Sequence, residues 1–140
     1  MTRRVLRQLL VRAGWAPAAV FVFHGLVQKT PWRAALDFPI HFLGGLSIAC
    51  FFFHAIASAP SLLGGLERIP RYIFAFSLAC TTGVFWEFGE LFSDVFFHTH
   101  IQHSVRETMS DLVADASGAA LSLVLVAVAR ASAQRLGKIR

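Results

Sequence analysis

The sequence predicts an all-α integral membrane bundle of about four transmembrane helices, with both termini in the cytoplasm. Three observations predict it: an apolar composition, four long apolar runs and an uneven distribution of charge. Apolar residues make up 56% of the 140-residue chain and charged residues only 15%, and the mean hydropathy is +0.60. Soluble domains carry about a quarter charged residues. A single domain of this length cannot bury so many apolar side chains behind a water-facing surface, so we expect a bilayer around it.

Four apolar runs follow one another along the chain with clear breaks between them. A helix needs about 20 apolar residues to cross the hydrocarbon core. The candidate spans are residues 14–28, 40–59, 72–92 and 111–131. The first is short and contains Pro17, so we expect it to begin near Leu9 with Arg12 reaching towards the surface, or to tilt. A cleaved signal peptide is the competing interpretation, and Arg12 and Pro17 argue against it because they interrupt the run.

Positive charges gather in segments that four spans would place on one side of the membrane. Ten of the thirteen lysines and arginines lie near the N-terminus, between the second and third runs, or near the C-terminus. Because such segments stay in the cytoplasm, both termini are predicted to be cytoplasmic. The domains expected are a basic N-terminal segment 1–13, a four-span domain 14–131 and a basic tail 132–140. The net charge of +5 then suits anionic lipid headgroups, and no nucleic-acid partner is expected.

Acidic residues show the opposite asymmetry. Seven of the eight belong to the outer ends of the second, third and fourth runs. An ionisable side chain inside a span is costly unless it is paired, hydrated or coordinating an ion, so the grouping indicates a site. The acids at this end are Asp37, Glu87, Glu90, Asp94, Glu107, Asp111 and Asp115.

Helical spacing aligns these acids on two facing stripes. Glu87, Glu90 and Asp94 are three and four residues apart, so they share one face of the third helix. On the fourth helix, acids recur every four residues. Matching depth at about 1.5 Å per residue between antiparallel neighbours pairs Glu87 with Asp115 and Glu90 with Asp111.

The loop before the fourth helix carries a start signal for that helix. Ser104 and Glu107 form a capping-box pattern, which predicts that the helix begins before its apolar part. Small residues at four-residue spacing predict close helix packing rather than ligand contact. These residues are Gly44, Gly45, Ala49, Ala114 and Gly118.

Histidines add nitrogen ligands to the same end. His41 lies four residues after Asp37 on the second helix, and His24 lies towards the outer end of the first. His54 is predicted near the cytoplasmic end and is left out of the site. The loop between the third and fourth helices adds His98, His100 and His103. A hydrated periplasmic loop is an equally good interpretation of these three.

The residues of this end resemble a known family. The strings Asp37-x3-His41-x2-Gly44, Trp86-Glu87-x2-Glu90-x3-Asp94, Thr99-x2-Gln102 and Thr108-Met109-x-Asp111-Leu112-x2-Asp115-x2-Gly118 are similar to those of the YjdF-like family of small bacterial inner-membrane proteins, and more distantly to VanZ-like proteins. The chain departs from the pattern at His98, His100 and Glu107. The resemblance implies a multi-pass protein of the bacterial inner membrane whose acids form a site, and it implies no particular activity.

Several carboxylates cannot all be ionised side by side in a low dielectric, so protons, a basic group or a bound cation must compensate them. We expect a divalent cation held by His41, Glu87, Glu90, Asp111 and Asp115. The entrance to this site is predicted at Asp37, Asp94, His98, His100 and His103. Mixed carboxylate and imidazole ligands suit Zn, Mn or Fe, and carboxylates with water and carbonyl groups suit Mg or Ca, so the metal stays open.

Three classes of function fit this pattern. The protein is an ion-binding or transport protein, a metal-assisted hydrolase of a lipid or headgroup substrate, or an accessory subunit whose acids only lock the fold. Hydrogen-bonded acids that merely hold the bundle together are the structural alternative to a metal site. The partners expected are the lipid bilayer and either further copies of the chain or a larger membrane complex.

Overall fold

The computed structural model describes residues 7, 9–58, 60 and 65–137. In this part of the chain the fold is all-helical, without strands, and the predicted fold class is confirmed to that extent. The elements are the π-helix η1 (Leu10–Gly14), α2 (Trp15–Val27), α3 (Arg33–Ser58), α5 (Arg68–Phe97) and α6 (Val105–Gly137). Parts of the predicted terminal segments, residues 1–6 and 138–140, lie outside the described residues.

Three of the helices, α3, α5 and α6, are longer than the apolar runs that predicted them. α3 begins at Arg33 rather than at residue 40, and α5 continues to Phe97 rather than ending at 92. The capping prediction for α6 is confirmed, since the Glu107 amide donates to Ser104 Oγ over 3.2 Å and the helix begins at Val105. The break between α5 and α6 is therefore the short loop 98–104.

Two of the helices meet the length and apolarity needed to cross a membrane. These are α3 and α6, while α2 is a shorter apolar helix. α5 is equally long but carries Glu87, Glu90 and Asp94 in its second half, which lowers its mean hydropathy.

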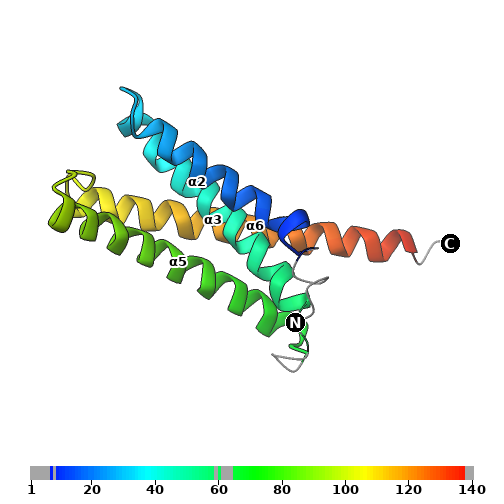
Figure 1. Cartoon of the computed structure of the whole chain (residues 1–140). Helices are drawn as coiled ribbons and strands as arrows, with labels where there is room; N and C mark the ends of the chain where they lie inside the picture. The colour runs from blue at the N-terminus through cyan, green and yellow to red at the C-terminus, as the bar shows by residue number, and fades with distance from the viewer. Residues whose placement is uncertain (1–6, 8, 59, 61–64, 138–140) are drawn as a thin grey trace.

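α3 is the centre of the bundle. It packs along α6 most extensively and then against α5, while α2 packs on α3 and η1 (Figure 1). The α2–α3 turn and the α5–α6 loop lie at the same end, where Arg33 Nη2 is 2.6 Å from His103 Nε2. The last turns of α6 project beyond the other helices (Figure 1).

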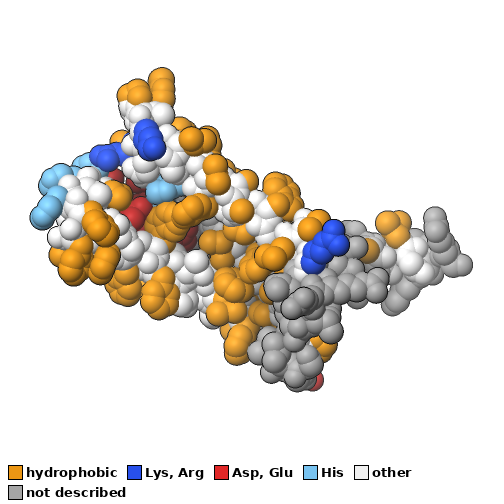
Figure 2. Space-filling view, viewed as in Figure 1, with side chains coloured by type: hydrophobic (Ala, Val, Ile, Leu, Met, Phe, Trp, Pro, Cys, Tyr) orange, Lys and Arg blue, Asp and Glu red, His pale blue; other side chains and the backbone are white. Residues whose placement is uncertain are grey.

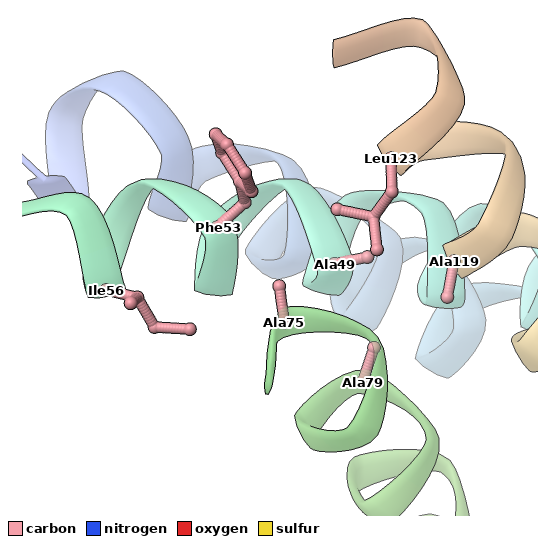
Figure 3. Close-up of a cluster of buried hydrophobic side chains, with 7 residues drawn as sticks. All are labelled: Ala49, Phe53, Ile56, Ala75, Ala79, Ala119 and Leu123. Carbon is pink, nitrogen blue, oxygen red and sulfur yellow. The ribbon is translucent and has the colours of Figure 1, made fainter. Parts of the chain in front are cut away.

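The apolar core lies in the half of the bundle that is farther from this loop end. The core contains alanines of α5 and α6 together with Phe53, the one large side chain among the described residues that is less than 2% exposed. Figure 3 shows these side chains converging from the three helices. The cluster consists of Ala49, Phe53, Ile56, Ala75, Ala79, Ala119 and Leu123. Arg130 lies over the Phe53 ring at 4.6 Å and closes the core with a cation–π contact.

Glycines bring the backbones of α3 and α6 into direct contact, as the small-residue spacing predicts. A Cβ added to Gly45 would collide with the backbone of Asp115, and one added to Gly118 would collide with the carbonyl oxygen of Phe42. On α5, a Cβ at Gly83 would overlap the Asp115 carboxylate. The three helices can therefore approach one another this closely only because these three glycines have no side chain.

Replacing Gly118 tests this contact. We expect Gly118→Ala to destabilise the bundle by about 1–3 kcal/mol, because the added methyl overpacks a backbone that cannot yield, and to lower the apparent Tm in detergent. Gly89→Ala is the matched control, because a Cβ there meets nothing within 4 Å. The control is expected to keep or slightly raise Tm, since alanine is the better helix former. The same Tm for both variants would contradict the account.

Candidate metal centre

Three helices each place an acid or a histidine in one buried cluster. His41 comes from α3, Glu87 from α5, and Asp111 and Asp115 come from α6 one helical turn apart. All four residues are buried, with exposed fractions of 4–6%. The acids are therefore packed between helices instead of facing water or lipid.

His41 is the hub of the cluster. Its Nδ1 atom lies 3.4 Å from Asp115 Oδ2 and 3.9 Å from Glu87 Oε1, and its Nε2 atom lies 4.0 Å from Asp37 Oδ1. One potential ligand atom from each of His41, Glu87 and Asp111 lies within 4.8 Å of the others. The three side chains are therefore near enough to one another that they could hold a common ion.

The two oxygens of Glu87 have different surroundings. Gln102 Nε2 donates to Oε2 over 3.1 Å and to the Glu87 carbonyl over 3.0 Å. Oε1 is buried and has no hydrogen-bond partner among the described residues. It points towards His41, so this oxygen is free to coordinate an ion.

Glu90 lies on a different side of α5 from Glu87, towards α2. Its Oε1 accepts a hydrogen bond from Trp86 Nε1 over 2.9 Å and lies 3.7 Å from His24 Nε2. His24 is also 2.8 Å from Gln28 Nε2. Glu90 therefore belongs to a second polar group at the edge of the cluster. Glu90 and Asp115 are the two predicted ligands outside the group of residues that share a common centre.

The register of α5 against α6 differs by one turn from the predicted one. Depth matching pairs Glu87 with Asp115, whereas the structure places Glu87 by Asp111 and sets Gly83 against Asp115. The loop is the physical reason. α5 runs on to Phe97, past the level at which α6 begins, so each position on α6 meets a position on α5 about four residues earlier than predicted.

Asp94 organises this tight loop. Its Oδ1 accepts from Thr99 Oγ1 and from the Ile101 amide, both over 2.6 Å, and its Oδ2 accepts from the Gln102 amide over 2.8 Å. The same Gln102 side chain holds Glu87. Asp94 thus acts on the cluster by positioning Gln102.

The loop histidines are exposed. His98 and His100 have left-handed backbone conformations, with φ of 55° and 58°, and no hydrogen bond or ion pair joins them to the cluster in the described part of the chain. His103 contacts Glu107 Oε2 at 3.3 Å and Arg33. His54 is exposed in the half of α3 away from this loop, as the sequence predicts.

Comparison with known proteins places the chain in a family. Residues 10–132 match the family described as "Predicted membrane protein (DUF2238)". The chain belongs to this family. No curated protein and no solved structure matches it. Membership supports a membrane protein, while the resemblance to the YjdF-like and VanZ-like proteins stays a prediction.

A cavity of about 330 Å³ adjoins the cluster, a size typical of small-molecule sites. His41 and Asp115 line it from α3 and α6, His24 lines it from α2, and Trp86 from α5. Sequence reasoning left His24, Trp86 and Gln102 out of the site. Two signals in the sequence could have included them: His24 lies at the outer end of its helix, and Gln102 lies within one of the family strings.

The hydrogen bonds that Asp94 accepts from Thr99 and from the backbone of Ile101 and Gln102 hold the pKa of its carboxyl below the ordinary value. Asp94 therefore stabilises the loop above the pH at which an unfolded aspartate titrates, and this contribution is lost as pH falls through the lowered pKa. We expect the Ile101 amide NMR signal to titrate with a midpoint below that of an exposed aspartate.

Asp94→Asn supplies the control for this titration. The variant is expected to lack the acidic transition and to exchange the Gln102 amide faster at neutral pH, because a neutral amide accepts more weakly than a carboxylate. A midpoint in the wild type at or above the ordinary aspartate range would contradict this role.

Proposed function

We propose that the protein is a four-span membrane bundle that binds a divalent cation at the cluster of His41, Glu87, Asp111 and Asp115. The buried Glu87 Oε1 carries the proposal. It has no hydrogen-bond partner in the described part of the chain, and it belongs to the residues whose ligand atoms share a common centre. An unpaired buried oxygen costs free energy that a bound cation would recover.

Charge balance supports the same conclusion. Three carboxylates surround one imidazole, and among the described residues no lysine or arginine lies within 4.0 Å of them. Neighbouring carboxylates in a low dielectric repel one another. A divalent cation offsets this repulsion without distorting the helices.

The ligand types favour a transition metal. Imidazole combined with carboxylates suits Zn, Mn or Fe, whereas Mg and Ca prefer oxygen ligands alone. Asp115, at hydrogen-bond distance from His41 Nδ1, would orient the imidazole when the other ring nitrogen, Nε2, takes the ion. Glu90 and His24 would act one layer further out.

The proposed topology puts the cluster at the periplasmic end of a bundle in a bacterial inner membrane, with both termini cytoplasmic. The distribution of the ten basic residues supports this orientation. Asp37, Asp94 near the end of α5, and the loop residues His98, His100 and His103 would then surround the entrance from the periplasm. The many exposed apolar side chains suit lipid, a second copy of the chain or a larger membrane complex.

A second function is favoured by the cavity beside the cluster. A metal-assisted hydrolase needs an open coordination position and space for a substrate, and the cavity reaches His41 and Asp115. The substrate of such an enzyme would be a lipid or its headgroup. An accessory subunit, whose acids only hold the bundle, is the remaining alternative.

Elemental analysis of the purified protein tests the metal proposal. We expect about one transition-metal ion per chain, and its loss in Glu87→Gln because the amide removes the anionic ligand. Asp115→Asn is expected to weaken binding by about 10–100-fold, as loss of an orienting carboxylate does.

Glu67→Gln is the matched control, since this glutamate lies at the opposite end of α5 and its side chain makes no capping hydrogen bond. It is expected to keep the metal. Wild-type protein that retains no metal even after addition of Zn, Mn or Fe would refute the proposal and leave the accessory role. Equal metal content in the wild type, Glu87→Gln and Asp115→Asn would move the site elsewhere.

A reporter fused after residue 140 tests the topology. We expect cytoplasmic activity from a C-terminal fusion, because an even number of spans returns the chain to the side of the membrane on which it began. We expect a cysteine placed at His100 to be accessible from the periplasm. A periplasmic signal from the C-terminal fusion would refute four spans.

A further inference from the structure

The cavity next to the cluster has a polar end and an apolar end. The polar end is at His24, His41 and Asp115. The apolar end is at Pro17, Phe51 and Phe52. On α3 the cavity extends from His41 to Phe52, which corresponds to about 16 Å along the helix axis. The polarity therefore changes along the direction in which the helices run.

The cavity opens sideways. α2 packs on α3 without its backbone approaching α5, and side chains bridge the gap at the polar end, where Phe21 meets Trp86 edge-on with centroids 5.7 Å apart. Figure 2 shows acidic and histidine side chains in a hollow between α2 and α5, with hydrophobic side chains towards the middle of the bundle and Lys, Arg and His side chains towards the loop end. Phe21, which borders this opening, is 63% exposed. A ligand entering here would come from an apolar surrounding.

Polarity along the helix axis matches one class of ligand. A membrane lipid has its headgroup near the surface and its chain towards the middle of the bilayer, which is the order of polar and apolar ends in the cavity. A water-soluble ligand could reach the polar end from the periplasm, but it would leave the apolar end of the cavity unfilled.

Charge selects the headgroup. The carboxylates Glu87, Asp111 and Asp115 would repel an anion, but a divalent cation among them offsets two of their three negative charges and can take an anionic oxygen as a further ligand. Phosphate is the anionic group that most membrane lipids share, and one of its oxygens could bind the cation. The buried, unpartnered Glu87 Oε1 marks the place where the cation would sit.

We propose that this cavity binds the hydrocarbon chain of an anionic phospholipid that enters between α2 and α5, with its phosphate on the cation held by the cluster. The proposal rests on the proposed function, because the cation is what makes the cluster accept an anion. It identifies an anionic lipid as the ligand or substrate of the site.

Trp86 lines the cavity and reports on its occupancy. Trp15 and Trp32 are 65% and 67% exposed and lie outside the cavity lining, so a background with Trp15→Phe and Trp32→Phe leaves Trp86 as the only emitter. The probe is a single-chain alkyl phosphate that carries bromine next to the phosphate, titrated into metal-loaded protein in non-ionic micelles. We expect saturable quenching.

Two pairs of matched variants separate the cavity from the lipid-facing surface. Val20→Phe on α2 and Thr82→Phe on α5 fill the cavity, and each is expected to raise the half-quenching concentration at least tenfold. Val22→Phe and Thr81→Phe make the same kind of change at exposed positions outside the lining, and no change is expected. The Thr82 hydroxyl bonds only the Leu78 carbonyl of its own helix, so its loss leaves the contacts between helices intact.

Removal of the metal and two further probes complete the test. Chelation is expected to abolish saturable quenching, and neither inorganic phosphate nor the brominated alcohol should reproduce it. Equal quenching in the filled and exposed variants would overturn the lipid proposal. Quenching that survives chelation would overturn the role of the cation in holding the phosphate, and full displacement by equimolar inorganic phosphate would remove the role of the chain. If any of these results appears while the protein still binds metal, the lipid proposal fails and the proposed metal-binding function stands. If the protein binds no metal, the proposed function itself fails.

Discussion

The direct contact between the backbones of α3 and α6 is the constraint on which the rest of the site depends. Gly45 and Gly118 leave no room for a Cβ between the two helices. The contact fixes which turn of α6 faces which turn of α3, and so places Asp115 at 3.4 Å from His41. Gly83 extends the same fit to α5, since the Asp115 carboxylate occupies the space where its Cβ would be. Small residues thus do more here than permit packing, because they set the positions of the buried charges.

The loop between α5 and α6 adds the third member of the cluster. Asp94 closes the loop by accepting three hydrogen bonds, and the ordered Gln102 then binds one oxygen of Glu87. The other oxygen stays unpartnered among the described residues and faces His41. A network that only held the bundle together would satisfy both oxygens, since unsatisfied buried groups are costly. The arrangement is therefore better explained by a cation than by structural hydrogen bonds alone.

Sequence patterns predicted the helices, the contact at Gly45 and Gly118 and the convergence of His41 with the buried acids, because periodicity and burial follow from local residue types. They did not predict the register of α5, since depth matching depends on the loop, and the hydrogen bonds of Asp94 that shape the loop join residues across a turn. They also did not predict that Glu90 faces His24. A stripe of acids three and four residues apart spans an arc of the helix, and only packing decides which member turns towards which neighbour.

X-ray absorption spectroscopy of the metal-loaded protein tests the central claim most directly, because it reports the ligand atoms themselves. The account predicts a first shell of oxygen and nitrogen at about 2.0–2.2 Å with the outer-shell scattering of a single imidazole, that of His41. A shell that contains sulfur, or one without imidazole scattering, would contradict a cation held by His41, Glu87 and Asp111.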